Sequence, residues 1–169
     1  MVDFDVVSLP ETDHVDEGDV APDFARPLVG EEYWEDSALG EVVDGPTLLL
    51  FHPMDGAFQA TYLYNTVDDH GWADDLDVLG LSISTPYAHK RLLAERADGV
   101  RIFSDPGADV IEEYGVAHDI DGMTGITETR PAVFLLDADR TVEYAWVAGE
   151  HPEFPDAEAI DDAIDRLVD

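Results

Sequence analysis

The strongest constraint on the fold is an apolar strand that runs directly into a turn and then a helix. Leu48–Phe51 is uninterrupted apolar sequence, followed by a turn and a helical pattern from about Phe58 to Asp69. A strand of this kind is expected at the centre of a sheet covered by helices on both faces. In such sheets ligands bind beyond the carboxyl end of a strand, where the free N–H groups of the next helix favour an anion. The sequence therefore places the candidate site between residues 52 and 61.

The rest of the chain alternates between strand and helix patterns within what we expect to be one domain, residues 1–169. Residues 1–17 are acidic and weakly patterned, which indicates an arm or edge element. Two extended pieces, Gly18–Phe24 and Pro27–Trp34, predict a hairpin. The helix predicted after the apolar strand should turn Phe58, Tyr62, Leu63 and Val67 inward. Further strands are predicted at 76–83, 100–103, 132–137 and 141–147. Three further helices are predicted: one that begins at residue 86, one that ends at residue 115, and one over 156–167.

The charge of the chain predicts the solvent in which it is stable. It carries 40 acidic and 8 basic residues, a net charge of −32, yet its 45% hydrophobic content argues against disorder. The acids are spread through every segment, a surface typical of proteins from organisms that keep molar salt in the cytoplasm. Self-repulsion of these charges weakens the fold at low salt and is screened at high salt. We therefore expect a halophilic, acidic, cytoplasmic protein.

The same charge excludes several partners. Nucleic acid and anionic membranes require a basic patch, and Arg91, Arg96 and Arg101 near Lys90 are too few to form one. No apolar run approaches the ~20 residues that span a bilayer, and the N-terminus has no signal-peptide pattern. We expect neither a nucleic-acid nor a membrane partner.

The residue types that usually carry metal or thiol chemistry are absent or scattered. With no cysteine there can be no disulfide, thiolate zinc site or thiol catalysis. The acidic turns Asp74–Asp77 and Asp137–Asp139 lack the glycine and final glutamate of a calcium loop. No metal site and no cofactor are predicted. The histidines are too dispersed for a metal-ligand pattern, so we interpret them as surface or locally hydrogen-bonded residues: His52, His70, His89, His118 and His151.

Three segments together resemble one protein family. They are Gly-x-x-Ala-Pro-x-Phe at Gly18–Phe24, Pro53 in the turn, and Ser104-Asp105 followed by Tyr114-Gly115-Val116. Their order and spacing resemble the AhpC/TSA branch of the peroxiredoxins, from Gly18 to the last helix. The resemblance implies an α/β, thioredoxin-like fold with a mixed central sheet flanked by helices and an N-terminal hairpin of the peroxiredoxin type. It also implies an antioxidant, thiol-dependent peroxidase.

The reactive residues that the resemblance implies are missing. In the family a proline is followed four residues later by threonine and seven residues later by the peroxide-attacking cysteine. Here Pro53 is followed by Ala57 and Ala60, and Asn65 stands at the position of the resolving cysteine. The site is therefore interpreted as vestigial, with Arg130 as its fourth member.

The family's arginine has an uncertain counterpart in this chain. Arg130 lies in the right region, but counting back from Phe134 and Asp137 puts Pro131 at the arginine position. Pro131 also resembles the cis-proline that thioredoxins place beside their active site. We predict that a small anion binds at Ala57, Phe58 and Ala60, with Arg130 as a further candidate ligand.

Three functions follow from these observations. The first is a peroxiredoxin-like pseudoenzyme of the redoxin class that acts by binding or assembly, with any homodimer necessarily non-covalent. The second is an authentic peroxidase whose cysteine at position 60 was replaced by alanine. The third, a non-thiol enzyme using His52 or Arg130, has no specific support. One replacement explains Ala60 but not Ala57, Asn65 and Pro131, so we favour natural loss.

Overall fold

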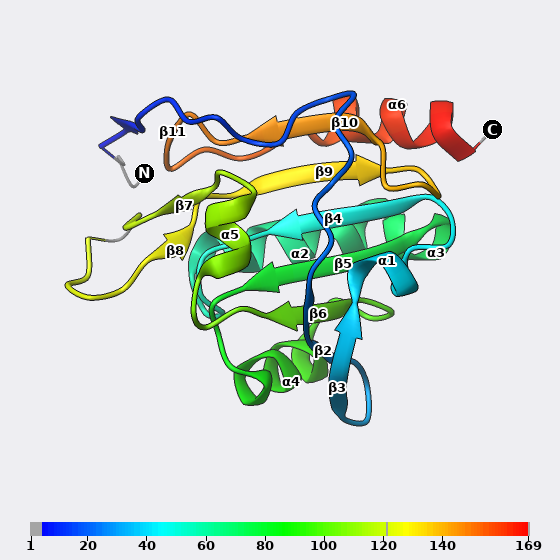
Figure 1. Cartoon of the computed structure of the whole chain (residues 1–169), viewed down its shortest axis with the longest axis horizontal. Coiled ribbons are helices and arrows are strands. Elements are labelled where there is room, and N and C mark those ends of the chain that lie inside the picture. Colours follow the sequence, from blue (N-terminus) through cyan, green and yellow to red (C-terminus); the bar gives the residue numbers. More distant parts are fainter. Residues whose placement is uncertain (1–4, 121, 169) are drawn as a thin grey trace.

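A computed structural model describes residues 5–120 and 122–168, and within them a seven-stranded mixed sheet forms the centre of the fold (Figure 1). The strand order is β10-β9-β4-β5-β6-β2-β3. Strands β4, β5 and β6 are parallel to one another, whereas β9, β10, β2 and β3 each pair antiparallel to their neighbours. The strands are β2 (Ala25–Val29), β3 (Trp34–Ala38), β4 (Thr47–Phe51), β5 (Asp77–Ser82), β6 (Arg101–Ser104), β9 (Ala132–Leu136) and β10 (Val142–Val147).

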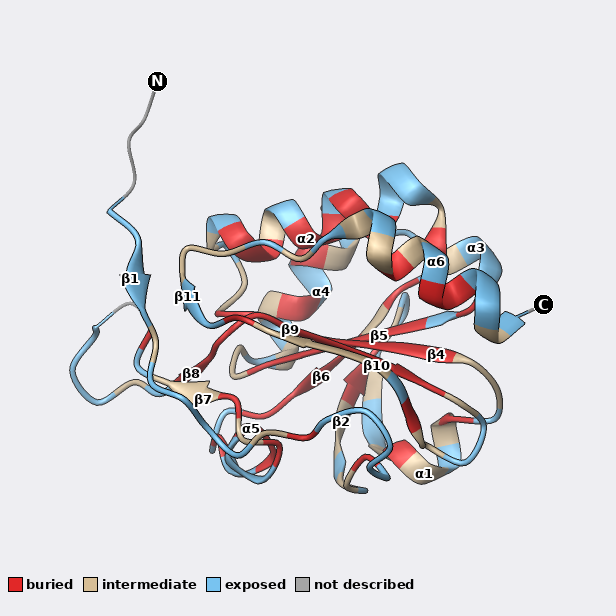
Figure 2. Cartoon of the chain, turned by 90° about the horizontal axis from the view of Figure 1, so that it is seen from above, coloured by how far each residue is buried: buried red, intermediate tan, exposed pale blue. Residues whose placement is uncertain are grey.

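Helices cover both faces of this sheet, and each face has its own apolar core (Figure 2). Alternate residues of β4 supply the two cores: Leu48 and Leu50 pack toward α2, while Leu49 and Phe51 pack toward α5. The predicted thioredoxin-like architecture is confirmed. One face carries α2 (Phe58–His70), α3 (Trp72–Asp75), α4 (Pro86–Glu95) and α6 (Ala157–Val168), and the other carries α1 (Leu39–Val42) and α5 (Asp109–Glu113).

The N-terminal hairpin exists, but it begins later than the sequence predicts. Its strands are β2 and β3, whereas residues 18–24 contribute only an isolated bridge, Val20 to Thr141. That segment runs past the start of β10, where Gly18 donates to the Val142 carbonyl. Part of the predicted N-terminal arm forms a short strand, β1 (Val7–Ser8), which pairs antiparallel with β11 (Glu150–His151). Residues 1–4 lie outside the described residues.

Helix α2 turns a different face to the sheet from the one predicted. Leu63 and Val67 are buried as expected, but Phe58 and Tyr62 are 45% and 47% exposed. Tyr64 takes their place in the core, and it lies over β5 where the chain has Gly80. A Cβ at Gly80 would stand 1.9 Å from the Tyr64 hydroxyl oxygen, so only glycine permits this approach.

The other local predictions agree with the structure. Pro86 opens α4, and the hydroxyl of Thr85 caps that helix by accepting from the Ala88 N–H. Asp105 accepts from two N–H groups of α5, and Gly115 ends the helix with a φ of +74°. The remaining described strands, β7 (Ala117–His118) and β8 (Glu128–Thr129), pair with each other. None of the described helices has the length and apolar content required to cross a bilayer.

Candidate active site of the family fold

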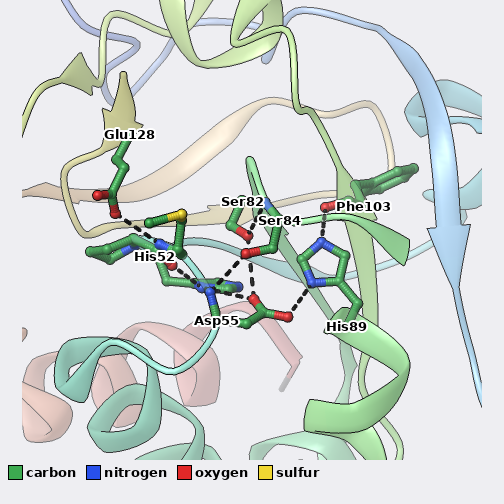
Figure 3. Close-up of polar contacts among 9 residues, drawn as sticks. His52, Asp55, Ser82, Ser84, His89, Phe103 and Glu128 are labelled. Carbon is green, nitrogen blue, oxygen red and sulfur yellow. Dashed lines mark hydrogen bonds and ion pairs between the residues drawn. The ribbon is translucent and has the colours of Figure 1, made fainter. Parts of the chain in front are cut away.

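The turn after β4 carries a buried carboxylate that joins three elements (Figure 3). Asp55 Oδ2 lies 2.7 Å from Nδ1 of His89 on α4, and Asp55 Oδ1 accepts from the Ser82 hydroxyl at 3.3 Å. The backbone N–H of Asp55 donates to the Ser84 hydroxyl at 2.9 Å. The Asp55 side chain is only 7% exposed. This cluster lies at the carboxyl ends of β4 and β5, the position where open α/β sheets hold their ligands.

The hydrogen bonds of His89 determine how many protons the cluster holds. Nε2 of His89 lies 3.0 Å from the Phe103 carbonyl oxygen, which can only accept, so Nε2 carries a hydrogen. A second hydrogen must lie between Nδ1 and Asp55, because an ionised carboxylate also only accepts. The pair therefore holds two hydrogens and, with Asp55 ionised, consists of an imidazolium and a carboxylate that are both withdrawn from water.

His52 lies beside this pair in the opposite protonation state. Its ring is fully buried, Nδ1 lies 2.7 Å from the Pro53 carbonyl oxygen, and Nε2 has no partner among the described residues. Burial lowers the pKa of His52 to about 4, and the charge of His89 adds to the lowering while Asp55 opposes it. His52 is thus neutral at pH 7 and donates to Pro53. The interpretation of His52 and His89 as locally hydrogen-bonded is correct, but neither lies at the surface.

The neutral, buried His52 predicts a loss of stability in acid. Its pKa is about 4 in the folded chain and 6.5 in the unfolded one, so between these values the unfolded state binds the extra proton. Neutral His52 makes its full contribution to the free energy of unfolding above pH 6.5. That contribution is lost as the pH falls toward 4, by about 3 kcal/mol in total. Urea unfolding in molar KCl at a series of pH values measures it. The same series on His52→Leu should show a shallower decline below pH 6.5, and parallel curves would contradict the prediction.

The predicted anion-binding residues form the start of α2. Ala57 is the N-cap residue, and its side chain makes no capping bond to the first turn of the helix. Ala60 is fully buried in the first turn, and Phe58 is half exposed. Asn65, one turn further along, accepts from Arg96 Nη1 at 3.0 Å.

Arg130 does not join this site, which corrects the prediction that it could bind an anion beside Ala57 and Ala60. Its Nη1 donates to the carbonyls of Pro10 and Ala148, at 3.1 and 3.3 Å. The reason is the alternation of side chains along a strand. Arg130 precedes β9 in phase with Ala132 and Phe134, which pack on the α5 side of the sheet, away from α2.

Pro131 is not a cis-proline, contrary to the prediction. Among the described residues the cis peptide bond is His151–Pro152. Pro131 continues extended backbone into β9: the Arg130 N–H donates to Val116, and the Pro131 carbonyl accepts from Ala148. That sheet-like pairing on both sides of the bond fits a trans peptide.

A cavity of about 460 Å³ opens beside the cluster, between α2 and α4. Arg91 lines it and has no carboxylate within 4 Å among the described residues, and Arg96 lines it while bonded to Asn65. Sequence reasoning noted these arginines only as too few for a basic patch. The remaining lining residues are Asp55, Gly56, Thr61, Tyr87, Ala88, Leu92 and Glu95.

The pairing of Asp55 with His89 was also missed from the sequence. One signal was available, because His89 lies three residues before the buried Leu92 on the same helical face. The contact itself joins residues 34 positions apart and needs the tertiary fold. Within the described residues, no group of three or more metal-ligating side chains converges.

Comparison with known proteins places this arrangement in a family. The model of the AhpC/TSA family matches residues 17–145. No curated protein matched the chain in a sequence search.

Solved structures agree with the fold. A reduced 2-Cys peroxiredoxin from Plasmodium vivax is similar with a TM-score of 0.72 and 21% identity, over 90% of this chain and 96% of that one. Peroxidoxin BcpB from Mycobacterium tuberculosis gives a TM-score of 0.69 and 21% identity, over 91% and 97% of the two chains. AhpC from Mycobacterium tuberculosis gives 0.69 and 17%, over 91% and 98%. Since the family model runs from the arm into the last strand of the central sheet, the protein belongs to the AhpC/TSA family.

Proposed function

We propose that this protein has lost thiol peroxidase chemistry and acts by binding a small anion in the cavity between α2 and α4. The observation that carries the proposal is a contrast within one site. The reactive position is a buried alanine, Ala60, and the charges of Asp55 and His89 are committed to each other. Arg91 on the cavity wall, in contrast, has no carboxylate partner among the described residues.

The chemistry of the cluster supports binding rather than turnover. Peroxide reduction in this family requires attack by a thiolate, and the chain has none. Ser82 and Ser84 are the nearest hydroxyls, but both nitrogens of His89 are already engaged, by Asp55 and by the Phe103 carbonyl. His89 is therefore not free to deprotonate either serine. The unpartnered Nε2 of His52 forms no hydrogen bond with them among the described residues, so no serine–histidine pair of a hydrolytic site is assembled.

The cavity offers an anion two kinds of donor. Arg91 and Arg96 are two of only 8 basic residues, and Thr61 adds a hydroxyl. Thr61 lies in the first turn of α2, where the positive end of the helix dipole favours negative charge by about 0.3–1 kcal/mol at exposed sites. Glu95 on the same wall opposes an anion. A small carboxylate that reaches Arg91 while avoiding Glu95 fits this distribution.

The alternative function is an authentic peroxidase in which cysteine 60 was replaced by alanine. A single replacement would leave the family's threonine and arginine in place. Ala57 stands where the threonine is expected, and Arg130 lies on the far side of the sheet from Ala60. These observations favour natural loss.

Peroxide consumption by the unmodified chain, with dithiothreitol as reductant in molar KCl, tests the loss of chemistry. No turnover above buffer is expected, and Ala60→Cys alone should not produce family-like turnover, because Arg130 lies on the other side of the sheet. Rapid turnover by Ala60→Cys would instead support the engineered alternative. Turnover by the unmodified chain would refute the proposal.

Anion binding is tested separately by titrating acetate at constant chloride and following backbone amide resonances of residues 56–61. Arg91→Gln should weaken the response, while Arg166→Gln, an exposed change on α6, should leave it unchanged. Equal affinities in all three proteins would exclude the cavity as the site.

The proposal includes a cellular setting that follows from the surface charge. A chain with net charge −32 suits a high-salt cytoplasm, and acidic surfaces repel one another unless they are screened. A non-covalent homodimer would therefore tighten as salt rises. Sedimentation at low and molar KCl distinguishes this from a monomer at every salt concentration.

A further inference from the structure

We infer a second anion site, specific for a small organic carboxylate, where Arg130 lies beneath the N-terminal arm. This site is separate from the cavity between α2 and α4, and its argument is independent of the proposed function. It rests on a buried guanidinium without a counter-charge among the described residues, on a cavity at that guanidinium, and on an arm that forms one wall of the cavity.

The surroundings of Arg130 leave its charge uncompensated. The residue is 4% exposed, and no carboxylate lies within 4 Å of it among the described residues. Arg26, the partly buried arginine beside α5, shows the usual solution, because its Nε lies 3.0 Å from a carboxylate oxygen of Asp105. A buried charge without such a partner is strongly unfavourable. A chain with 40 acidic residues has nonetheless left this cation unpaired.

One edge of the guanidinium is free of hydrogen bonds. Both hydrogen bonds that Arg130 donates from its guanidinium to described residues use Nη1, with the carbonyls of Pro10 and Ala148 as acceptors. Nε is buried without a partner, and Nη2 donates to no described residue. Nε and Nη2 form the side of the guanidinium that grips a carboxylate through two parallel hydrogen bonds. Burial also lowers the pKa of Arg130, as expected for a cation that lacks an anion.

The cavity at Arg130 measures about 580 Å³ and is walled by the arm and the end of β10. Ser8 and Thr12 line it, and neither hydroxyl has a hydrogen-bond partner among the described residues. His14 also lines it, with Nδ1 engaged by the Val15 carbonyl. Glu11 is the one carboxylate among the lining residues, and it would repel an anion near its end of the cavity. The ligand must therefore sit at the Arg130 end.

The arm is held firmly enough to build a site. The Leu9 N–H donates to the Gly149 carbonyl, and the Val15 N–H donates to the Tyr114 carbonyl. Between these anchors the arm passes so close to Gly115 that a Cβ there would lie 2.6 Å from the Asp13 carbonyl oxygen. A ligand on Arg130 would contact a fixed surface, and its binding would tie the arm more tightly to the sheet.

Geometry and size select the class of ligand. Two parallel N–H groups match the two oxygens of a carboxylate, whereas chloride would use only one point of attraction. The volume exceeds what acetate fills, so the remainder of an organic acid can extend toward the hydroxyls of Ser8 and Thr12. A monocarboxylate with a short hydroxylated or apolar tail fits this space and avoids a second charge near Glu11.

The test follows the arginine Nε resonances of the full-length chain by ¹H–¹⁵N correlation at constant molar chloride. Titrating lactate, and acetate as the shorter probe, should shift the Arg130 signal to saturation, with lactate tighter. Arg130→Gln removes the Arg130 signal, and lactate should no longer raise the melting temperature of this variant. Arg166→Gln should retain both the Arg130 signal and the stabilisation by lactate. The double variant Ser8→Ala with Thr12→Val changes two exposed residues of the arm. Its affinity for lactate should be about tenfold lower, as expected when hydrogen bonds to a charged ligand are lost.

The outcomes separate this site from the first cavity. Arg91→Gln should leave the Arg130 response intact, so failure of the proposed function does not remove this inference. If Arg130→Gln fails to fold, the arm variant and the wild-type Nε signal still decide the question. A non-saturating shift, or saturation by chloride alone in the absence of carboxylate, would overturn the assignment.

Discussion

Asp55→Ala is expected to destabilise the folded chain by about 3–5 kcal/mol, the cost of removing one partner from a buried ion pair. The carboxylate compensates the imidazolium of His89, and both side chains are withdrawn from water. It also accepts from Ser82 at the end of β5, so the substitution leaves a hydroxyl and a cation without their acceptor. Urea unfolding in molar KCl at pH 7 measures the loss.

Two further variants distinguish a lost charge pair from a lost side chain. Asp55→Asn combined with His89→Gln removes both charges and should recover part of the stability that Asp55→Ala loses, since replacing a whole buried pair is often neutral. Asp74→Ala, an exposed acid on α3, should change stability by less than about 0.5 kcal/mol. An Asp55→Ala effect as small as that of Asp74→Ala would mean that water reaches His89.

Raising KCl from 0.01 M to molar concentration is expected to raise the melting temperature by about 10 °C or more. Two carboxylates 10 Å apart in water repel by about 0.4 kcal/mol, and a net charge of −32 on 169 residues sums many such pairs. The Debye length falls from about 30 Å at 0.01 M to about 3 Å at 1 M, which removes nearly all of this repulsion. The described structure offsets few of these acids with cationic side chains, since its Arg–carboxylate pairs are those of Arg26.

Repeating the salt series near the isoelectric point provides the control. The sequence pI is about 4.1, and there the net charge approaches zero, so the dependence on KCl should become much weaker. Sucrose at matched osmolality, which does not screen charge, should act equally at both pH values. A melting temperature that is flat in KCl at pH 7 would show that the acids are compensated locally.

The fold was predictable because its signals are local and agree with one another. The apolar run of β4, the proline that opens α4 and the glycine that ends α5 each specify an element within a few residues. The short connection between β9 and β10 specifies an antiparallel pair. The hairpin was placed too early because Gly18–Phe24 is extended without being paired along its length, a distinction that extended sequence does not reveal.

The site was less predictable because it depends on which way side chains face. A one-residue offset between Arg130 and Pro131 was visible in the sequence, and strand alternation converts that offset into opposite faces of the sheet. The predicted packing face of α2 is wrong because the large apolar side chains of Phe58 and Tyr62 favoured the wrong stripe. The buried stripe consists of Ala60, Leu63, Tyr64 and Val67. The Asp55–His89 pair joins distant segments, and no local pattern encodes that meeting.

The alternation of β9 also limits how this protein can change in evolution. Cysteine at 60 and threonine at 57 are each one substitution away, but neither moves the guanidinium of Arg130 to the α2 side of the sheet. That requires replacing Pro131, or a one-residue slip that would exchange every side chain of β9 between the two cores. The slip passes through misfolded chains, and an arginine at 131 gains nothing until the thiol exists. If thiol chemistry has been lost as proposed, a return to peroxide reduction with an arginine at position 131 requires more than one substitution.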